Sequence, residues 1–251
     1  MPVPVSIGEV VDRLQDRIDV LPAEFDHRRI FIQTYQRTTR AVGTAVETGF
    51  FEDPGWVVRW DVAFADLFLV AHDHDRLAAA GRPAPLVPRP WRLAFAASDE
   101  LPTLAHLLLG MNAHINYDLP QALLQVISEP DFTDPGLLAL RRRDHERIDS
   151  ILTTRVAAED RELGGSRTLV DRLMTPANRF SSRRFLRESR QKVWLNVAAL
   201  HEARVAGPAA YQTRLAELEL LAAAKVADLL APGSTLVRLA VAGFGITLPP
   251  V

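Results

Sequence analysis

The sequence predicts an all-α fold, a single-domain bundle of about seven or eight helices with a buried polar site. Apolar residues recur at helical spacing, and capping residues, Gly and Pro punctuate the chain. Almost no segment has the alternating pattern of a strand. The 251 residues are 48% hydrophobic and 24% charged, which excludes a disordered chain. No repeat and no low-complexity linker divides the sequence, so we expect one helical domain over residues 1–251.

Helix start and stop signals set the expected elements of the N-terminal half. Ser6 and Glu9 form a capping box, and Asp53 followed by Pro54 caps a later helix. Glycines that favour left-handed backbone follow the second and third helices. The predicted helices cover residues 7–20, 27–48 and 53–80. Residues 81–90 contain four prolines and are expected to form an extended connector.

The C-terminal half shows the same punctuation. Pro120 lies inside an apolar segment and is expected to kink or restart the helix there. The predicted elements are a short segment over 91–97, helices over 98–117, 134–162, 181–206 and 209–231, and a short piece over 167–174. The apolar tail, residues 234–251, is expected to pack as irregular chain over the core.

Charge and composition exclude several classes of function. A formal net charge of −2 gives no net attraction to nucleic acid, so no such partner is expected. The absence of Cys removes thiol chemistry and Cys-ligated metals, and no phosphate-binding glycine loop or dinucleotide fingerprint predicts a nucleotide cofactor. The uncharged stretch 101–117 is too short and polar for a membrane span, and no secretory signal is present, so a cytoplasmic location is expected. The oligomeric state stays open.

The most informative segment is HLLLGMNAHINYDLP, residues 106–120. His106, Gly110, His114 and Asp118 follow at intervals of four, which places them on one face of a helix. His114 and Asp118 are spaced to converge on one divalent metal ion, with zinc, iron or manganese as candidates. His106 lies about 12 Å along the axis from His114, so it is expected to face a substrate as a general acid or base. Gly110 leaves a gap for a ligand, water or neighbouring helix.

Structural roles are open for the same residues. Asp118 precedes Leu119 and Pro120 and is also consistent with the N-cap of a restarted helix. His114 is also consistent with a core histidine bonded to a carbonyl group. Asn112 and Asn116 lie four apart on the neighbouring face, where they are expected either to bind substrate or to bridge to adjacent helices.

Other segments contribute one carboxylate and two aromatic side chains to the expected site. Asp61 lies beside an apolar helix face, and buried carboxylates are usually paired, so Asp61 is expected to meet His106 or His114. Trp91 and Trp194 are candidate walls of a substrate pocket.

Two charged runs are expected to be solvated surface rather than sites. In the run His72–Asp75, consecutive residues point around the helix in different directions. The run Arg141–Arg147 is dense in charge and is typical of a solvent-exposed helix face.

The segments HLLLGMNAHINYDL and FFEDPGWVVRWDVAFADLF, with residues 91–95, resemble the bacterial domain-of-unknown-function family 5995. The resemblance is clearest over residues 49–124 and implies a shared helical fold and a shared polar site. The residues that match the family's pattern are Asp61, His106, Asn112, His114 and Asp118. Asp66 departs from the Asn of that pattern, and the family name supplies no reaction. The His114–Asp118 spacing is also similar to a ligand pair of helical zinc phospholipases and nucleases, although the further His residues of that motif are missing.

Three functions are consistent with these observations. The first is a metal-dependent hydrolase of an ester or phosphoester, with His114 and Asp118 as ligands. Asp61 would then be a third ligand or a partner that orients the ligands, and His106 the general acid or base that acts on a metal-activated water. The second is a metal-free cyclase or isomerase that acts on an apolar natural-product intermediate by His and Asp acid–base chemistry. Either enzyme would take a small-molecule substrate. The third is a non-enzymatic helical binding or scaffold protein whose polar stripe fixes helix register.

Overall fold

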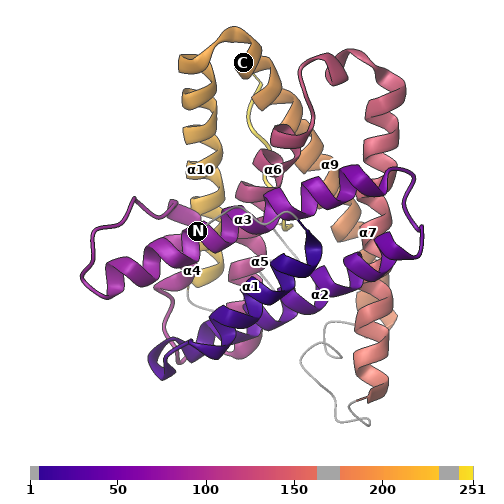
Figure 1. Cartoon of the computed structure of the whole chain (residues 1–251). Helices are drawn as coiled ribbons and strands as arrows, with labels where there is room; N and C mark the ends of the chain where they lie inside the picture. Colours follow the sequence, from indigo (N-terminus) through magenta and orange to yellow (C-terminus); the bar gives the residue numbers. More distant parts are fainter. Residues whose placement is uncertain (1–5, 163–175, 232–242, 251) are drawn as a thin grey trace.

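The protein is described by a computed structural model that covers residues 6–162, 176–231 and 243–250 (Figure 1). Every regular element among these residues is a helix, which confirms the all-α prediction. The α-helices are α1 (Ile7–Asp19), α2 (Arg29–Glu47), α3 (Pro54–Ala79), α4 (Arg89–Phe95), α5 (Thr103–Ala113), α6 (Leu119–Val126), α7 (Pro135–Glu162), α9 (Pro176–Ala206) and α10 (Pro208–Leu230). Short 3-10 turns, η1 (Ala23–Arg28) and η3 (Pro130–Thr133), precede α2 and α7, and a single π turn, η2 (His114–Asp118), joins α5 to α6. The expected piece over 167–174 lies outside the described residues.

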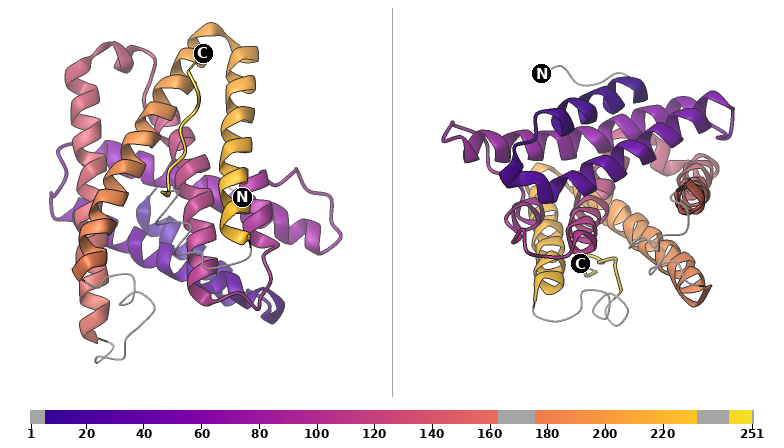
Figure 2. Two further views of the ribbon diagram at one scale, coloured as in Figure 1. Left: turned by 180° about the vertical axis from the view of Figure 1, so that it is seen from behind. Right: turned by 90° about the horizontal axis from the view of Figure 1, so that it is seen from below.

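The helices form two layers that cross each other. Helices α1, α2 and α3 run side by side in one layer, and α5, α6, α9 and α10 lie behind them in the second (Figures 1 and 2). The main hydrophobic core lies between the layers and includes Phe68, Trp91 and Leu109. The segment of α5, η2 and α6 passes through this core, which explains why its polar side chains are buried.

Aromatic residues at four-residue spacing form a stripe along α3. The residues are Trp56, Trp60, Phe64 and Phe68. The Trp56 and Trp60 rings stack with their centres 6.1 Å apart, and the Trp60 and Phe64 rings do the same. Since residues four apart share a helix face, the stripe follows directly from the sequence.

Pro120 does not end the long apolar helix. Leu119 donates its N–H to the carbonyl of His114, five residues back, so the chain makes one π turn and continues as α6. Pro120 has no N–H to donate and its ring would clash with the carbonyl four residues earlier, and a widened turn relieves both problems. Asp118 keeps helical backbone angles and makes no capping bond, so its interpretation as an N-cap is wrong.

Both charged runs were wrongly expected to be solvated. His72 is buried, Asp73 pairs with Arg17 at 2.6 Å, and Asp75 pairs with Arg28 at 2.6 Å.

The run Arg141–Arg147 also has a buried face. Asp144 is fully buried and accepts hydrogen bonds from the backbone N–H groups of Glu52 and Asp53, while His145 packs inside against Trp60 and Trp194. A charge-rich helix still has one inward face, and ion pairs and hydrogen bonds compensate the buried charges there.

Several boundaries differ from the predictions. Helix α5 begins at Thr103 rather than near residue 98, and α9 begins at Pro176 rather than at residue 181. The tail residues 243–250 are irregular, as expected, and they lie against α5 and α9. None of the helices in the described part of the chain has the combined length and apolarity that a membrane span needs.

Candidate functional site

A buried hydrogen-bonded pair lies at the π turn. His114 Nδ1 lies 2.8 Å from Asp118 Oδ2, and Trp91 Nε1 donates to the same oxygen at 2.8 Å. All three side chains are at most 4% exposed. A carboxylate accepts hydrogen bonds and cannot donate them, so we assign the proton of neutral His114 to Nδ1. Nε2 is then the acceptor of this imidazole.

Burial sets the protonation of the pair. It lowers the pKa of His114, and the hydrogen bond and charge of Asp118 oppose this shift. Burial also raises the pKa of Asp118, against the hydrogen bonds from His114 and Trp91. Both shifts disfavour charge in this part of the core.

Aromatic rings enclose the His114 imidazole. Phe64 stacks on it with ring centres 3.6 Å apart and planes 6° from parallel. Four further rings, from Phe31, Tyr35, Phe68 and Trp91, lie with their centres within 6.0 Å. His114 Nε2 is buried and has no hydrogen-bond partner. The enclosure therefore surrounds an unsatisfied acceptor, His114 Nε2, with aromatic side chains.

Asp61 approaches the same region from α3. It precedes Phe64 by about one helical turn, is 4% exposed, and its Oδ2 atom is buried without a partner. Burial raises the pKa of Asp61 to about 7. The carboxyl group is therefore partly protonated at neutral pH and has the pKa of a general acid.

Tyr35 connects Asp61 to the His114–Asp118 pair. Its ring centre lies 4.6 Å from that of His114. Burial raises the pKa of Tyr35, the charges of Asp61 and Asp118 raise it further, and the Thr39 hydroxyl opposes them. Asp61 and His114 thus share Tyr35 as a neighbour, and Phe64, three residues after Asp61 on α3, stacks on His114. We call the group of Tyr35, Asp61, His114 and Asp118 the inner site.

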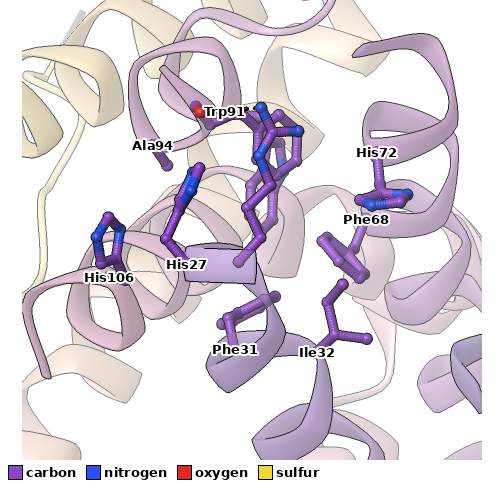
Figure 3. Close-up of a pocket in the computed structure, with 11 residues that line it drawn as sticks. His27, Phe31, Ile32, Phe68, His72, Trp91, Ala94 and His106 are labelled. Carbon is purple, nitrogen blue, oxygen red and sulfur yellow. Dashed lines mark hydrogen bonds between the residues drawn. The ribbon is translucent and has the colours of Figure 1, made fainter. Parts of the chain in front are cut away.

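His106 lies in a different place. Its ring is next to that of His27, with centres 4.9 Å apart, and both rings line a hollow of about 20 Å³ (Figure 3). Phe31, Phe68 and Trp91 line this hollow and also contact the His114 ring, so they form a wall between the two regions. The structure brings His114, Asp118 and Trp91 into direct contact and does not bring His106 to them.

Asn112 and Asn116 bind the C-terminal tail. Their side-chain amides donate to the carbonyl of Phe244 at 3.2 and 2.9 Å, and Asn116 Oδ1 accepts the N–H of Ile246 at 3.2 Å. These contacts fix the tail against α5 and η2. The Asn116 amide is therefore occupied by protein groups on both its nitrogen and its oxygen, whereas Asn112 uses its nitrogen and leaves a buried Oδ1 without a partner.

Trp194 and Gly110 are also accounted for by packing. Trp194 donates to His145 Nδ1 at 3.1 Å in a separate cluster at α7 and α9. A Cβ atom at Gly110 would lie 2.6 Å from the Phe31 ring, so the gap expected at Gly110 is filled by that ring.

The expected metal ligands bind each other. His114 and Asp118 form a hydrogen bond, and Trp91 donates a second hydrogen bond to the same Asp118 oxygen. Within the described ranges, no group of three or more His, Asp or Glu side chains is arranged to hold a metal ion. The donor atoms of this pair are therefore directed at each other and at Trp91 rather than at a shared ion position.

Sequence reasoning missed Tyr35, Phe64 and His27. The four-residue aromatic spacing along α3 was a usable signal for Phe64. Tyr35 and His27 reach the region from α2 and η1, and no local pattern announces a contact between segments so far apart in the chain.

Comparison with known proteins identifies the family. No curated protein and no solved structure matches the chain. The model of the family of unknown function DUF5995 matches residues 7–232, which is most of the chain and includes the whole inner site. The protein therefore belongs to the DUF5995 family.

Proposed function

We propose that the protein is a metal-independent enzyme that isomerises or cyclises a small, largely apolar molecule by proton transfer. His114 acts as the general base through Nε2, and Asp61 acts as the general acid. One observation carries this proposal: two buried atoms suited to proton transfer, His114 Nε2 and Asp61 Oδ2, lack hydrogen-bond partners and lie around the same Tyr35 side chain.

Unsatisfied buried polar atoms are costly, of order 1–3 kcal/mol each. The described residues contain further buried atoms without a partner, but His114 and Asp61 are also titratable groups with shifted pKa values, and such pairs concentrate at functional sites. A substrate polar group that reached both atoms would remove this cost. The neutral imidazole is in the form that accepts a proton, and the raised pKa of Asp61 keeps a proton available near pH 7.

The proposed reaction balances without a redox partner. His114 Nε2 removes a proton from a carbon or hydroxyl of the substrate, and Asp61 donates a proton at a second position. The proton on His114 and the charge on Asp61 are then restored by exchange with solvent or product. Asp118 stabilises the imidazolium that forms, and Trp91 holds the Asp118 carboxylate in place.

The aromatic enclosure indicates the substrate class. Phe31, Phe64, Phe68 and Trp91 offer apolar faces and no charge around His114. Such walls bind alkyl or aromatic groups and place a small number of polar contacts around them.

Deuterium incorporation tests this proposal. Purified protein is incubated in D2O with a fractionated metabolite extract, and mass spectrometry identifies metabolites that gain deuterium. The wild type should label one class of apolar metabolite. His114→Gln and Asp61→Asn should slow labelling by about 10²–10⁴-fold, and His201→Gln, a half-buried histidine remote from the inner site, should not.

A scaffold protein would give a different result in the labelling experiment. Asn112 and Asn116 hold the tail by hydrogen bonds, which is what a register-fixing network does. If the wild type labels nothing, or if labelling persists in a folded His114→Gln variant, the inner site is structural and the proposal fails.

A further inference from the structure

A second group of histidines lies outside the inner site and has no role in the proposed reaction. His27 on η1 and His106 on α5 bring their rings together at the edge of the hollow shown in Figure 3. His106 is 6% exposed, and its Nε2 atom is buried without a partner. Both ring nitrogens of His27 are also buried and make no hydrogen bond of normal geometry, although the Phe95 backbone acts on this ring as a weak acceptor. His106 Nε2 and at least one His27 nitrogen are thus available to a ligand in one small volume.

We propose that His27 and His106 bind one divalent transition-metal ion of the borderline class, such as zinc, with water completing its coordination. Imidazole nitrogen is a preferred ligand of these ions. Two imidazoles that bind one tetrahedral ion through bonds of about 2 Å have ring centres about 5 Å apart. The observed separation of 4.9 Å matches this spacing.

The size of the hollow favours an ion over an organic ligand. Its volume of about 20 Å³ is close to the space that one water molecule occupies. An ion with a bound water fits such a space with small side-chain movements, whereas an alkyl or aromatic molecule does not.

Charges around the pair act in both directions. The Arg28 guanidinium is adjacent to His27, but it pairs with Asp75 at 2.6 Å, which offsets its repulsion of a cation. The carboxylates of Asp99 and Asp26 act on His27, and that of Asp99 also acts on His106. These carboxylates favour a cation at the pair.

Metal titration tests the proposal. Chelator-treated protein is titrated with Zn²⁺ by calorimetry, and Cu²⁺ bound to the same protein is examined by electron paramagnetic resonance. The wild type should bind one ion per chain, and the Cu²⁺ spectrum should show two imidazole nitrogens. Loss of a residue that only hydrogen-bonds to a metal ligand lowers metal affinity about 10–100-fold. Loss of a ligand should cost at least as much, so His27→Ala and His106→Ala should each weaken binding by about tenfold or more. His201→Ala should bind as the wild type does.

Three results would overturn the proposal. One is no saturable binding of either ion to the wild type. Another is undiminished binding by the double variant of His27 and His106. The third is loss of binding on His114→Ala alone, which would move the ion to the inner site. The Cu²⁺ spectrum of the wild type shows how many imidazole nitrogens bind the ion, even if His106→Ala does not fold. Deuterium labelling tests the inner site in a separate experiment, so the two proposals can fail independently.

Discussion

Asp61→Asn should change the pH dependence of folding stability. The pKa of Asp61 is about 7 in the folded protein, because burial disfavours the carboxylate, against 3.8 for an ordinary Asp. Between these two pKa values the folded state keeps a proton that the unfolded state releases. Wild-type stability should therefore fall as the pH rises from about 4 to about 7 and then level off.

The size of this effect follows from the two pKa values. The folded and unfolded pKa values differ by about three pH units. Each unit corresponds to about 1.36 kcal/mol, so the effect is about 4 kcal/mol. Asn has nearly the shape of the protonated Asp and cannot ionise. The variant should match the wild type at pH 4 and exceed its free energy of unfolding by roughly 4 kcal/mol at pH 8.

Urea unfolding of both proteins at pH 4, 6 and 8 measures the difference directly. Asp73→Asn is the control, because bonds from His72 and Arg17 overcome the effect of burial and hold the pKa of Asp73 at about 2. Its stability contribution is lost only as the pH falls from the unfolded value of 3.8 towards 2. The Asp73 carboxylate is ionised in both states above about pH 5, so the Asp73→Asn difference should lack the rise expected for Asp61→Asn. An Asp61→Asn difference that also lacks this rise would refute a buried Asp61 with a raised pKa.

Three further substitutions test the packing around the inner site. Gly110→Ala should destabilise the protein by about 1–3 kcal/mol despite the better helix propensity of Ala, because its Cβ would lie 2.6 Å from the Phe31 ring. Gly8→Ala, whose Cβ would meet nothing closer than 3.8 Å, should be neutral or stabilising in the same urea assay, and equal effects would contradict the close approach at Phe31. Asn116→Ala leaves the Ile246 N–H without its acceptor and should lower the free energy of unfolding by about 1–3 kcal/mol. The tail should also become more sensitive to protease, and an unchanged digestion pattern would show that Asn116 does not hold the tail. Trp91→Phe removes the donor that stabilises the Asp118 carboxylate and should raise the pKa of Asp118, measured by carboxyl carbon NMR; an unchanged value would show that the Trp91 bond is not formed.

The fold was predictable because its signals are local. Ser6 and Asp53 cap helices as their positions in the sequence indicate, and each side chain accepts the expected backbone N–H. The π turn before Pro120 was not predictable in detail. The proline requires an irregularity in the helix, but the sequence does not show whether that irregularity is a kink, a break or a π turn. The burial of Asp144 depends on two backbone N–H groups about ninety residues away, and no local pattern reports such a contact.

The candidate site was predictable in part. Four-residue spacing correctly placed His114 and Asp118 within reach of each other. The same spacing placed His106 on that face, yet the Phe31, Phe68 and Trp91 wall separates it from them. Helical periodicity determines the direction in which each side chain points from the helix axis. The neighbours that the side chain meets at its position along the axis depend on tertiary packing. Asn116 illustrates the same limit, because its amide partner lies in a tail 128 residues away.

The proposed chemistry requires that a neutral His114 with a free Nε2 acceptor shares the Tyr35 neighbourhood with an Asp61 that is partly protonated at pH 7. Nitrogen-15 NMR of the imidazoles, with His114 assigned by His114→Gln, measures the protonation of each ring nitrogen directly. At pH 7, Nδ1 of His114 should carry the proton and Nε2 should not, and the carboxyl carbon of Asp61 should titrate near pH 7. A doubly protonated His114 at pH 7, or a proton on Nε2 alone, would contradict this assignment.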